Sequence, residues 1–194
     1  MKRILGIVGA LLLLMGSVTA GLCAPGDPVE IFYDLTQLSV DTWEYSYTVQ
    51  NHSLIGARGY GVIMFDTFFP VDETSILPAG TPPNWNPLTF EPNTPGVHGG
   101  PSGIYDAQSP NTPIIGRSPI DPGESLSGFN VTFHSAGTPP GPQYFEVVDP
   151  NTEDGDWLKI LASGYTTPFP VPEPLSGFMF AFGLFGLAVA RRKR

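Results

Sequence analysis

The sequence is poor in cysteine and in internal basic residues. Cys23 is the single cysteine, so no disulfide can form within the chain and packing must stabilise the fold. Between the two ends, only Arg58, Arg117 and Lys159 carry positive charge, against all 18 acidic residues. Because phosphate binding needs clustered lysine and arginine side chains, no nucleic-acid partner is expected.

Glycine and proline are abundant instead, with 23 and 22 of the 194 residues. This content disfavours long helices and is typical of many short strands joined by turns. A chain of this length has room for one domain with a single hydrophobic core.

Two segments near the start of the chain predict a β-hairpin. Residues 43–50 alternate between large apolar and polar side chains, as a half-buried strand does. Residues 30–37 alternate in the same way, so the two segments are expected to pair through a turn at 38–42. The apolar side chains of the second segment, which include Trp43, Tyr45 and Tyr47, are interpreted as core.

Further strands are expected along the rest of the chain. Residues 59–69 are apolar on both faces, which indicates a central strand. Alternation predicts strands at 129–133, 143–148 and 157–162, and shorter ones are expected at 88–91 and 114–117. The predicted fold is therefore all-β, an antiparallel β-sandwich or a jelly-roll-like single domain.

The first 20 residues have the pattern of a secretory signal peptide. A short cationic start at Lys2 and Arg3 precedes an apolar run, and small residues follow at Val18 and Ala20. Removal by signal peptidase after Ala20 is expected, which would export the acidic body.

The last residues predict a membrane helix with a cytoplasmic end. Residues 175–190 carry no charge, and as a helix they would span about 24 Å, less than the roughly 30 Å of a bilayer's hydrocarbon core. The four basic residues that follow favour the cytoplasmic side. These residues are Arg191, Arg192, Lys193 and Arg194. The span is marginal, so the predicted anchorage in the inner membrane is transient.

A proline-flanked glutamate stands directly before this span. Pro172 and Pro174 hold the backbone around Glu173 extended and exposed, which suits recognition by a processing enzyme. Residues Val171, Pro172, Glu173 and Pro174, the apolar span and the basic end together resemble the PEP-CTERM sorting signal of Gram-negative bacteria. That signal is also catalogued as the C-terminal domain of ice-binding proteins.

The resemblance covers residues 171–194 and implies processing by an exosortase, a membrane cysteine protease or transpeptidase. Members of this family are typically exported proteins of the cell surface or matrix, in organisms that make extracellular polysaccharide. The expected organisation is a signal peptide at 1–20, a β-sandwich body at 21–163, a linker at 164–171 and the sorting signal at 172–194.

No catalytic or metal-binding motif stands out in the body. The three histidines are far apart, no G-x-S-x-G sequence is present, and neither an enzymatic activity nor a cofactor is expected. One oxygen-rich segment suggests calcium, although a solvated turn explains it as well. Its candidate ligands are Asp149, Asn151, Glu153, Asp154 and Asp156.

The expected function follows from the predicted signal peptide and sorting signal. We expect an exported protein of the cell surface or extracellular matrix, sorted by an exosortase, with a structural or adhesive role. The alternative is a carbohydrate-binding module that uses exposed aromatic side chains on extracellular polysaccharide, with Trp85 in a proline-rich loop as the candidate contact. A secreted hydrolase is the third hypothesis.

The sorting hypothesis predicts a processing defect. Replacing Pro172, Glu173 and Pro174 together by alanine should leave a larger, membrane-retained form in the native host, because the processing enzyme would lose its recognition site. Immunoblots of membrane and extracellular fractions would measure this. A variant that matures and leaves the membrane like the parent would contradict the hypothesis.

Overall fold

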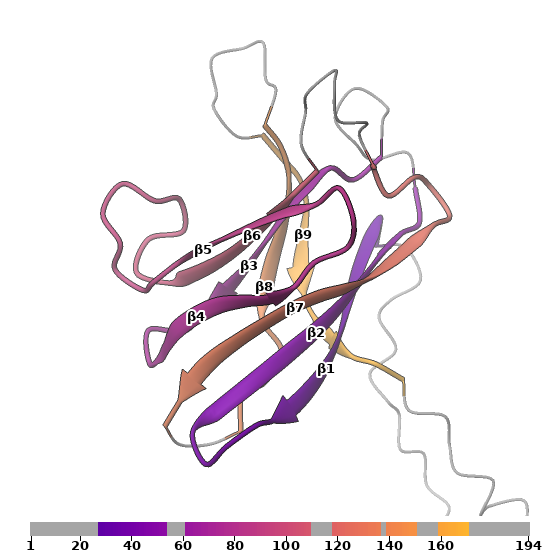
Figure 1. The fold of residues 1–194 in the computed structure, drawn as a ribbon. Coiled ribbons are helices and arrows are strands. Elements are labelled where there is room, and N and C mark those ends of the chain that lie inside the picture. Colours follow the sequence, from indigo (N-terminus) through magenta and orange to yellow (C-terminus); the bar gives the residue numbers. More distant parts are fainter. Residues whose placement is uncertain (1–26, 54–60, 110–117, 137–138, 151–158, 171–194) are drawn as a thin grey trace, which may run out of the picture.

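The computed structural model describes residues 27–53, 61–109, 118–136, 139–150 and 159–170. These residues form ten β-strands in two five-stranded sheets, which Figure 1 shows as two layers. The predicted signal peptide, the segment 175–190 and the predicted strand at 114–117 lie outside the described residues. In the described ranges, no helix is long and apolar enough to cross a membrane.

The first sheet has the strand order β10-β1-β2-β7-β4. Its strands are β10 (Thr167–Pro168), β1 (Val29–Gln37), β2 (Thr42–Asn51), β7 (Ser125–Ser135) and β4 (Glu73–Gly80). All its neighbours pair antiparallel except β10, which runs parallel to β1.

The second sheet has the order β5-β6-β3-β8-β9 and is antiparallel throughout. Its strands are β5 (Asn86–Phe90), β6 (Gly103–Gln108), β3 (Met64–Phe69), β8 (Tyr144–Asp149) and β9 (Lys159–Tyr165). The all-β class and the two-sheet arrangement that the sequence predicts are thus confirmed.

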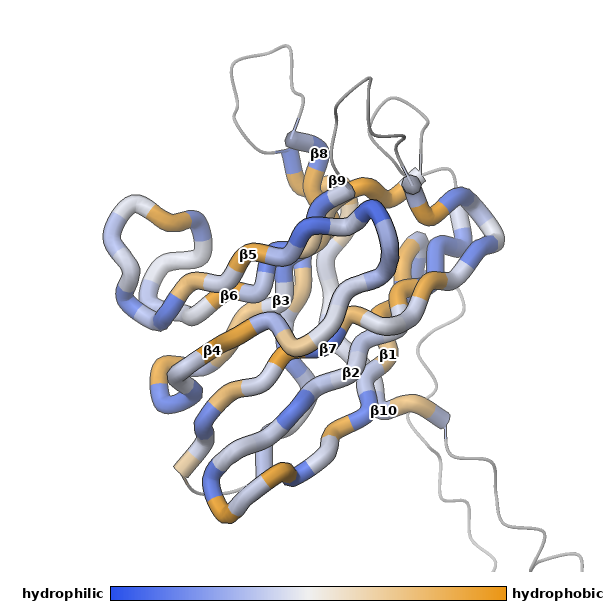
Figure 2. Tube along the Cα trace, in the orientation of Figure 1, coloured by the Kyte–Doolittle hydropathy of each residue, from blue (hydrophilic) through white to orange (hydrophobic). Residues whose placement is uncertain are grey.

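The predicted hairpin is confirmed, and the structure gives its register. β1 and β2 pair along their whole length, with Tyr33 opposite Tyr47, and the turn closes through a hydrogen bond from the Leu38 amide to the Thr42 carbonyl (2.9 Å). Tyr45 and Tyr47 are fully buried, so the interpretation of this aromatic face as core is confirmed. The same alternation of apolar and polar residues can be followed along β7 in Figure 2.

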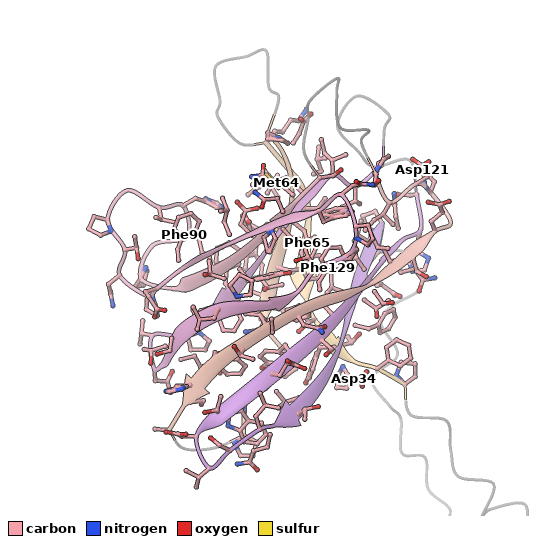
Figure 3. All side chains as sticks on the ribbon, in the orientation of Figure 1. Asp34, Met64, Phe65, Phe90, Asp121 and Phe129 are labelled. Atoms are coloured by element: carbon pink, nitrogen blue, oxygen red, sulfur yellow. The ribbon has the colours of Figure 1, made fainter. Side chains whose placement is uncertain are left out.

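Aromatic rings from both sheets fill the core between the layers. Tyr45 stacks on Phe133 with ring centroids 5.0 Å apart, and Phe69 of the second sheet packs edge-on against Phe133 at 5.3 Å. Phe65 of β3 meets Phe129 of β7 edge-on at 5.0 Å, and Figure 3 shows these two rings together between the layers. Such pairs contribute about 0.5–1.5 kcal/mol each beyond the burial of their area, so they fix how the sheets face each other.

The predicted linker at 164–171 is wrong for its first residues. Gly164 and Tyr165 complete β9, Thr167 and Pro168 pair with β1, and the Phe169 amide donates to the Tyr33 carbonyl (2.8 Å). This segment contains proline, as linkers often do, but its backbone amide groups donate hydrogen bonds within the fold. The chain here passes from one edge of the second sheet to one edge of the first.

Trp85 is also placed differently from its prediction. The turn from Pro82 to Trp85 directs the indole inward, where it is 6% exposed and packs edge-on against Phe129 at 5.0 Å. It also contacts Phe65, with ring centroids 6.1 Å apart. The interpretation of Trp85 as an exposed sugar contact is therefore wrong, because the side chain belongs to the core.

The burial of Trp85 predicts a loss of stability on truncation. The variant Trp85→Ala should lower the free energy of unfolding by about 3 kcal/mol or more, since a large buried ring is removed from a packed site. Urea denaturation would measure this. Leu88→Ala, at an exposed position on β5, is the control and should change stability by about 0.5 kcal/mol or less. Equal effects of the two variants would contradict the placement.

Candidate functional site

The face of the second sheet that is turned away from the core carries an unusual set of side chains. Successive residues of a strand point to opposite faces, so Phe65 and Thr67 face the core while Asp66 and Phe68 face outward. All six residues of β3 are nevertheless buried. This outward side, here called the outer face, is therefore covered as well.

Three carboxyl side chains form a row across the outer face. Asp66 of β3 lies directly opposite Asp106 of β6 and directly opposite Glu146 of β8. The same line continues to Leu88 on β5 and to Ser163 on β9. Side chains in such positions lie about 5 Å apart at their Cβ atoms, and like charges there repel. Asp106, Asp66 and Glu146 are called the acidic row below.

The acidic row has very little compensating charge. Lys159 is the sole lysine or arginine in the described parts of the chain. It lies opposite Asp149 in the ladder of β8 and β9, away from the row. Asp66 is 2% exposed, and one carboxyl oxygen of Asp66 and one of Asp106 are buried without a hydrogen bond. A buried carboxyl group in this position is more stable with its proton.

The pKa values follow this geometry. Burial, together with the charges of Asp106 and Glu146, raises the pKa of Asp66 to about 8. Burial raises the pKa of Asp106 to about 6, against a lowering influence of His98. At neutral pH, Asp66 therefore keeps its proton, and the row carries less negative charge than its three side chains suggest.

His98 covers the acidic row from above. Its Nε2 atom lies 2.7 Å from a carboxyl oxygen of Glu146 and 3.9 Å from one of Asp66, and its ring packs edge-on against Phe68 at 5.7 Å. The side chain of His98 is 35% exposed, whereas the carboxyl side chains beneath it are nearly inaccessible. His98 is thus the part of this cluster that solvent reaches most easily.

The connection between β5 and β6, residues 91–102, carries His98 and is called the covering loop. Gly99 has a φ of +101°, and a Cβ atom built there would lie 2.5 Å from the Phe68 ring, so only glycine lets the loop approach so closely. Glu91 holds the start of the loop by accepting hydrogen bonds from the Ser75 and Ile76 amides, both at 2.9 Å. A bond from the Asn93 amide to the Pro101 carbonyl (3.0 Å) closes it.

A row of aromatic rings runs beside the acidic row. Phe68 packs against Tyr144 with centroids 5.5 Å apart, and Tyr144 packs edge-on against Tyr165 at 5.7 Å. The Tyr144 hydroxyl donates to Glu146 (3.1 Å), which links the two rows. Exposure increases along the row from the buried Phe68 to Tyr165, which is 67% exposed. Phe68, Tyr144 and Tyr165 are called the aromatic row.

A second polar cluster lies between the sheets. The Tyr47 hydroxyl donates to the side-chain oxygen of Gln143, and the Tyr45 hydroxyl donates to the Gly141 carbonyl (2.7 Å). Burial, followed by the charge of Asp72, raises the pKa of the nearby Glu73 to about 7. Because the aromatic core encloses it, this cluster is less accessible to a large ligand than the outer face.

Several residues singled out in the sequence lie outside the described residues. These are the processing motif Val171, Pro172, Glu173 and Pro174, the basic end Arg191, Arg192, Lys193 and Arg194, and the calcium candidates Asn151, Glu153, Asp154 and Asp156. Asp149 is described, and it is buried at the end of β8. Within the described ranges, no group of three or more His, Cys, Asp or Glu side chains is placed to hold a metal ion.

Sequence reasoning did not find the outer-face site. Its members come from three strands and a loop, and His98 and Glu146 are 48 positions apart. One signal was present: Asp66 interrupts a long apolar run that is otherwise typical of a central strand. A charged residue at such a position needs a partner or a proton, and this could have directed attention to the outward side of β3.

Comparison with known proteins gives little further information. No protein-family model matches the chain, and no curated protein matches it. Among solved structures, the chain is similar to a biomass-sensing module of the Rsgi2 protein of Clostridium thermocellum, described as resembling the family 3 carbohydrate-binding module of the cellulosome. The TM-score is 0.39 at 11% identity, over 60% of this chain and 73% of that one, so the likeness supports no conclusion about fold or ligand.

The buried carboxyl groups predict a fold that is more stable in acid. The folded-state pKa values of Asp66, Glu73 and Asp106 lie above their ordinary values of 3.8, 4.5 and 3.8, so the folded protein holds protons that the unfolded chain has already lost. The contribution of these protonated carboxyl groups to the stability of the fold is complete below about pH 4 and is lost as the pH rises toward about 8.

Thermal melting should therefore give a higher Tm at about pH 5 than at about pH 8.5. In the variant Asp66→Asn, the Tm at about pH 8.5 should rise above that of the parent, because the amide never ionises. A Tm of the parent that increases between these two pH values would contradict the burial of the acidic row.

Proposed function

We propose that the protein is an exported, non-catalytic protein of the cell surface or extracellular matrix that binds polysaccharide on the outer face of its second sheet. The proposed export and sorting rest on the sequence of the two ends, with signal peptidase, an exosortase and, transiently, the inner membrane as partners. The proposed binding rests on the geometry of the body.

The observation that carries the binding proposal is the exposed end of the aromatic row. Tyr165 presents most of its ring to solvent, and the half-buried Tyr144 stands beside it and holds Glu146 by a hydrogen bond. Ring faces supply apolar area for the C–H faces of a sugar, while the tyrosine hydroxyl groups and the partly exposed imidazole of His98 fix its orientation. The strands β8 and β9 and the covering loop thus supply both kinds of contact that a sugar chain needs.

This assignment keeps the carbohydrate-binding hypothesis and changes its residues. The sequence suggests Trp85, which is in the core, whereas the structure places Tyr144 and Tyr165 on an accessible side of the sheet. A site that binds without reacting also agrees with an adhesive role in a polysaccharide matrix. The extended edge strand β9, from Lys159 to Tyr165, offers length along which a linear chain can lie.

A hydrolase is the competing hypothesis, and one observation favours it. Asp66 keeps its proton at neutral pH and stands directly opposite Glu146, and a pair of neighbouring carboxyl groups is the usual catalytic equipment of a glycosidase. However, Asp66 lies beneath His98 and is only 2% exposed. A glycosidic oxygen cannot reach it in this arrangement, so binding is the better supported function.

The binding proposal predicts a loss of affinity in Tyr165→Ala. Removing the exposed ring should weaken binding to the extracellular polysaccharide of the native host by about tenfold or more, with little change in Tm. Affinity electrophoresis in gels containing the polysaccharide would measure the effect. Phe169→Ala is the matched control, because Phe169 is also an exposed ring but packs against Phe32 of the first sheet.

Equal affinities of the parent, Tyr165→Ala and Phe169→Ala would refute the placement of the binding site. Release of reducing sugar from the polysaccharide by the parent would instead favour the hydrolase.

A further inference from the structure

The covering loop rests on two supports on the outer face. The first is the Phe68 ring, against which the backbone of Gly99 lies without room for a side chain. The second is the acidic row, where His98 binds Glu146 and lies close to Asp66. The loop therefore covers the inner end of the aromatic row and the middle of the acidic row at the same time.

We propose that the covering loop is a proton-controlled cover of the outer-face site, closed while Asp66 is protonated and released when Asp66 ionises. The effect of the covering loop on ligand binding rests on the proposed function. The movement of the loop itself is argued from the geometry alone.

The charges around Asp66 explain why protonation closes the loop. The titratable groups that face it are Asp106 from β6, Glu146 and Tyr144 from β8, and His98 from the covering loop. The neighbouring positions on β5 and β9 in the same line are Leu88 and Ser163, which do not titrate in this range. With Asp66 neutral, His98 can lie against Glu146 and close to Asp66, and the row can remain dry.

Ionisation changes this balance. A charged Asp66 would stand between two other carboxylates, with one buried oxygen that no group of the described chain satisfies. Such a group needs water, and water can reach it only if His98 and the loop move away. The raised pKa of Asp66 agrees with this, because burial and the neighbouring charges of Asp106 and Glu146 disfavour its charged form.

Release of the loop would enlarge the binding surface. Phe68 is buried beneath Gly99 and His98, and its exposure would extend the accessible aromatic row from Tyr165 and Tyr144 by a third ring. Polysaccharide binding is then expected to strengthen as the pH rises past neutrality. For the release of one proton, the open fraction rises by at most about tenfold per pH unit.

The test follows the amide NMR signals of Gly99 and Gly100 in the 15N-labelled full chain between about pH 5 and pH 9. The parent should show a transition of both signals above neutral pH, and Asp66→Asn should abolish it. Asp34→Asn is the control, because Asp34 is exposed on the outer side of the first sheet, and it should leave the transition unchanged.

A second variant gives a directional test that does not depend on Asp66→Asn folding. In Asp106→Asn the transition should move to lower pH, because Asp66 then ionises without the repulsion of Asp106. Loop signals that show no transition in the parent, or a transition that persists in Asp66→Asn or does not move in Asp106→Asn, would overturn the proposal.

Affinity for the polysaccharide at about pH 6 and pH 9 separates the two proposals. Tighter binding of the parent at the higher pH, lost in Asp66→Asn, supports control of the site by the loop. Binding that is equal at both pH values, with no transition of the loop, rejects the cover and leaves the proposed function in place. A loop transition without binding at either pH rejects the proposed function alone.

Discussion

The site depends on the register of three neighbouring strands, β6, β3 and β8. The pairing that sets Asp66 opposite Asp106 and Glu146 also sets Phe65 opposite Ala107 and Val147. Because side chains alternate along a strand, one register brings apolar groups together in the core and carboxyl groups together on the other face. A slip of one residue would carry carboxyl groups into the core, so the core itself enforces the assembly of the acidic row.

Protons replace cations in stabilising this arrangement. In most proteins a buried carboxyl group has a lysine or arginine partner. Here the described part of the chain has one such residue, Lys159, and it lies elsewhere. The row is tolerated because Asp66 is neutral at ordinary pH and His98 binds Glu146. Because basic residues are scarce in the body of the chain, the stability of the fold is expected to depend on pH.

The alternation of apolar and polar residues predicts much of the first sheet. It identifies β1, β2 and β7, and the turn between the first two, because each of these strands has one face in the core and one in contact with solvent. It does not identify β4 and β6. Pro78 lies within β4, and β6 follows a stretch rich in glycine and proline, so local sequence indicates loops where tertiary pairing makes strands.

The errors at Trp85 and in the predicted linker have a common cause. The polarity and proline content of the neighbouring residues predict exposed segments, whereas the positions of both segments are set by contacts with Phe129 and with β1, far away in sequence. The acidic row could not be found for the same reason. Composition and spacing describe what a residue is next to along the chain, and this site is made by what lies next to it across the sheet.

Burial of the acidic row beneath His98 underlies both the pH-dependent stability and the proposed movement of the covering loop. The most direct measurement is a 13C NMR titration of the side-chain carboxyl groups, with the Asp66 signal assigned by comparison with the Asp66→Asn variant. We expect this carboxyl group to carry its proton at neutral pH and to titrate near pH 8. A carboxyl group of Asp66 that titrates near its ordinary value of 3.8 would contradict it.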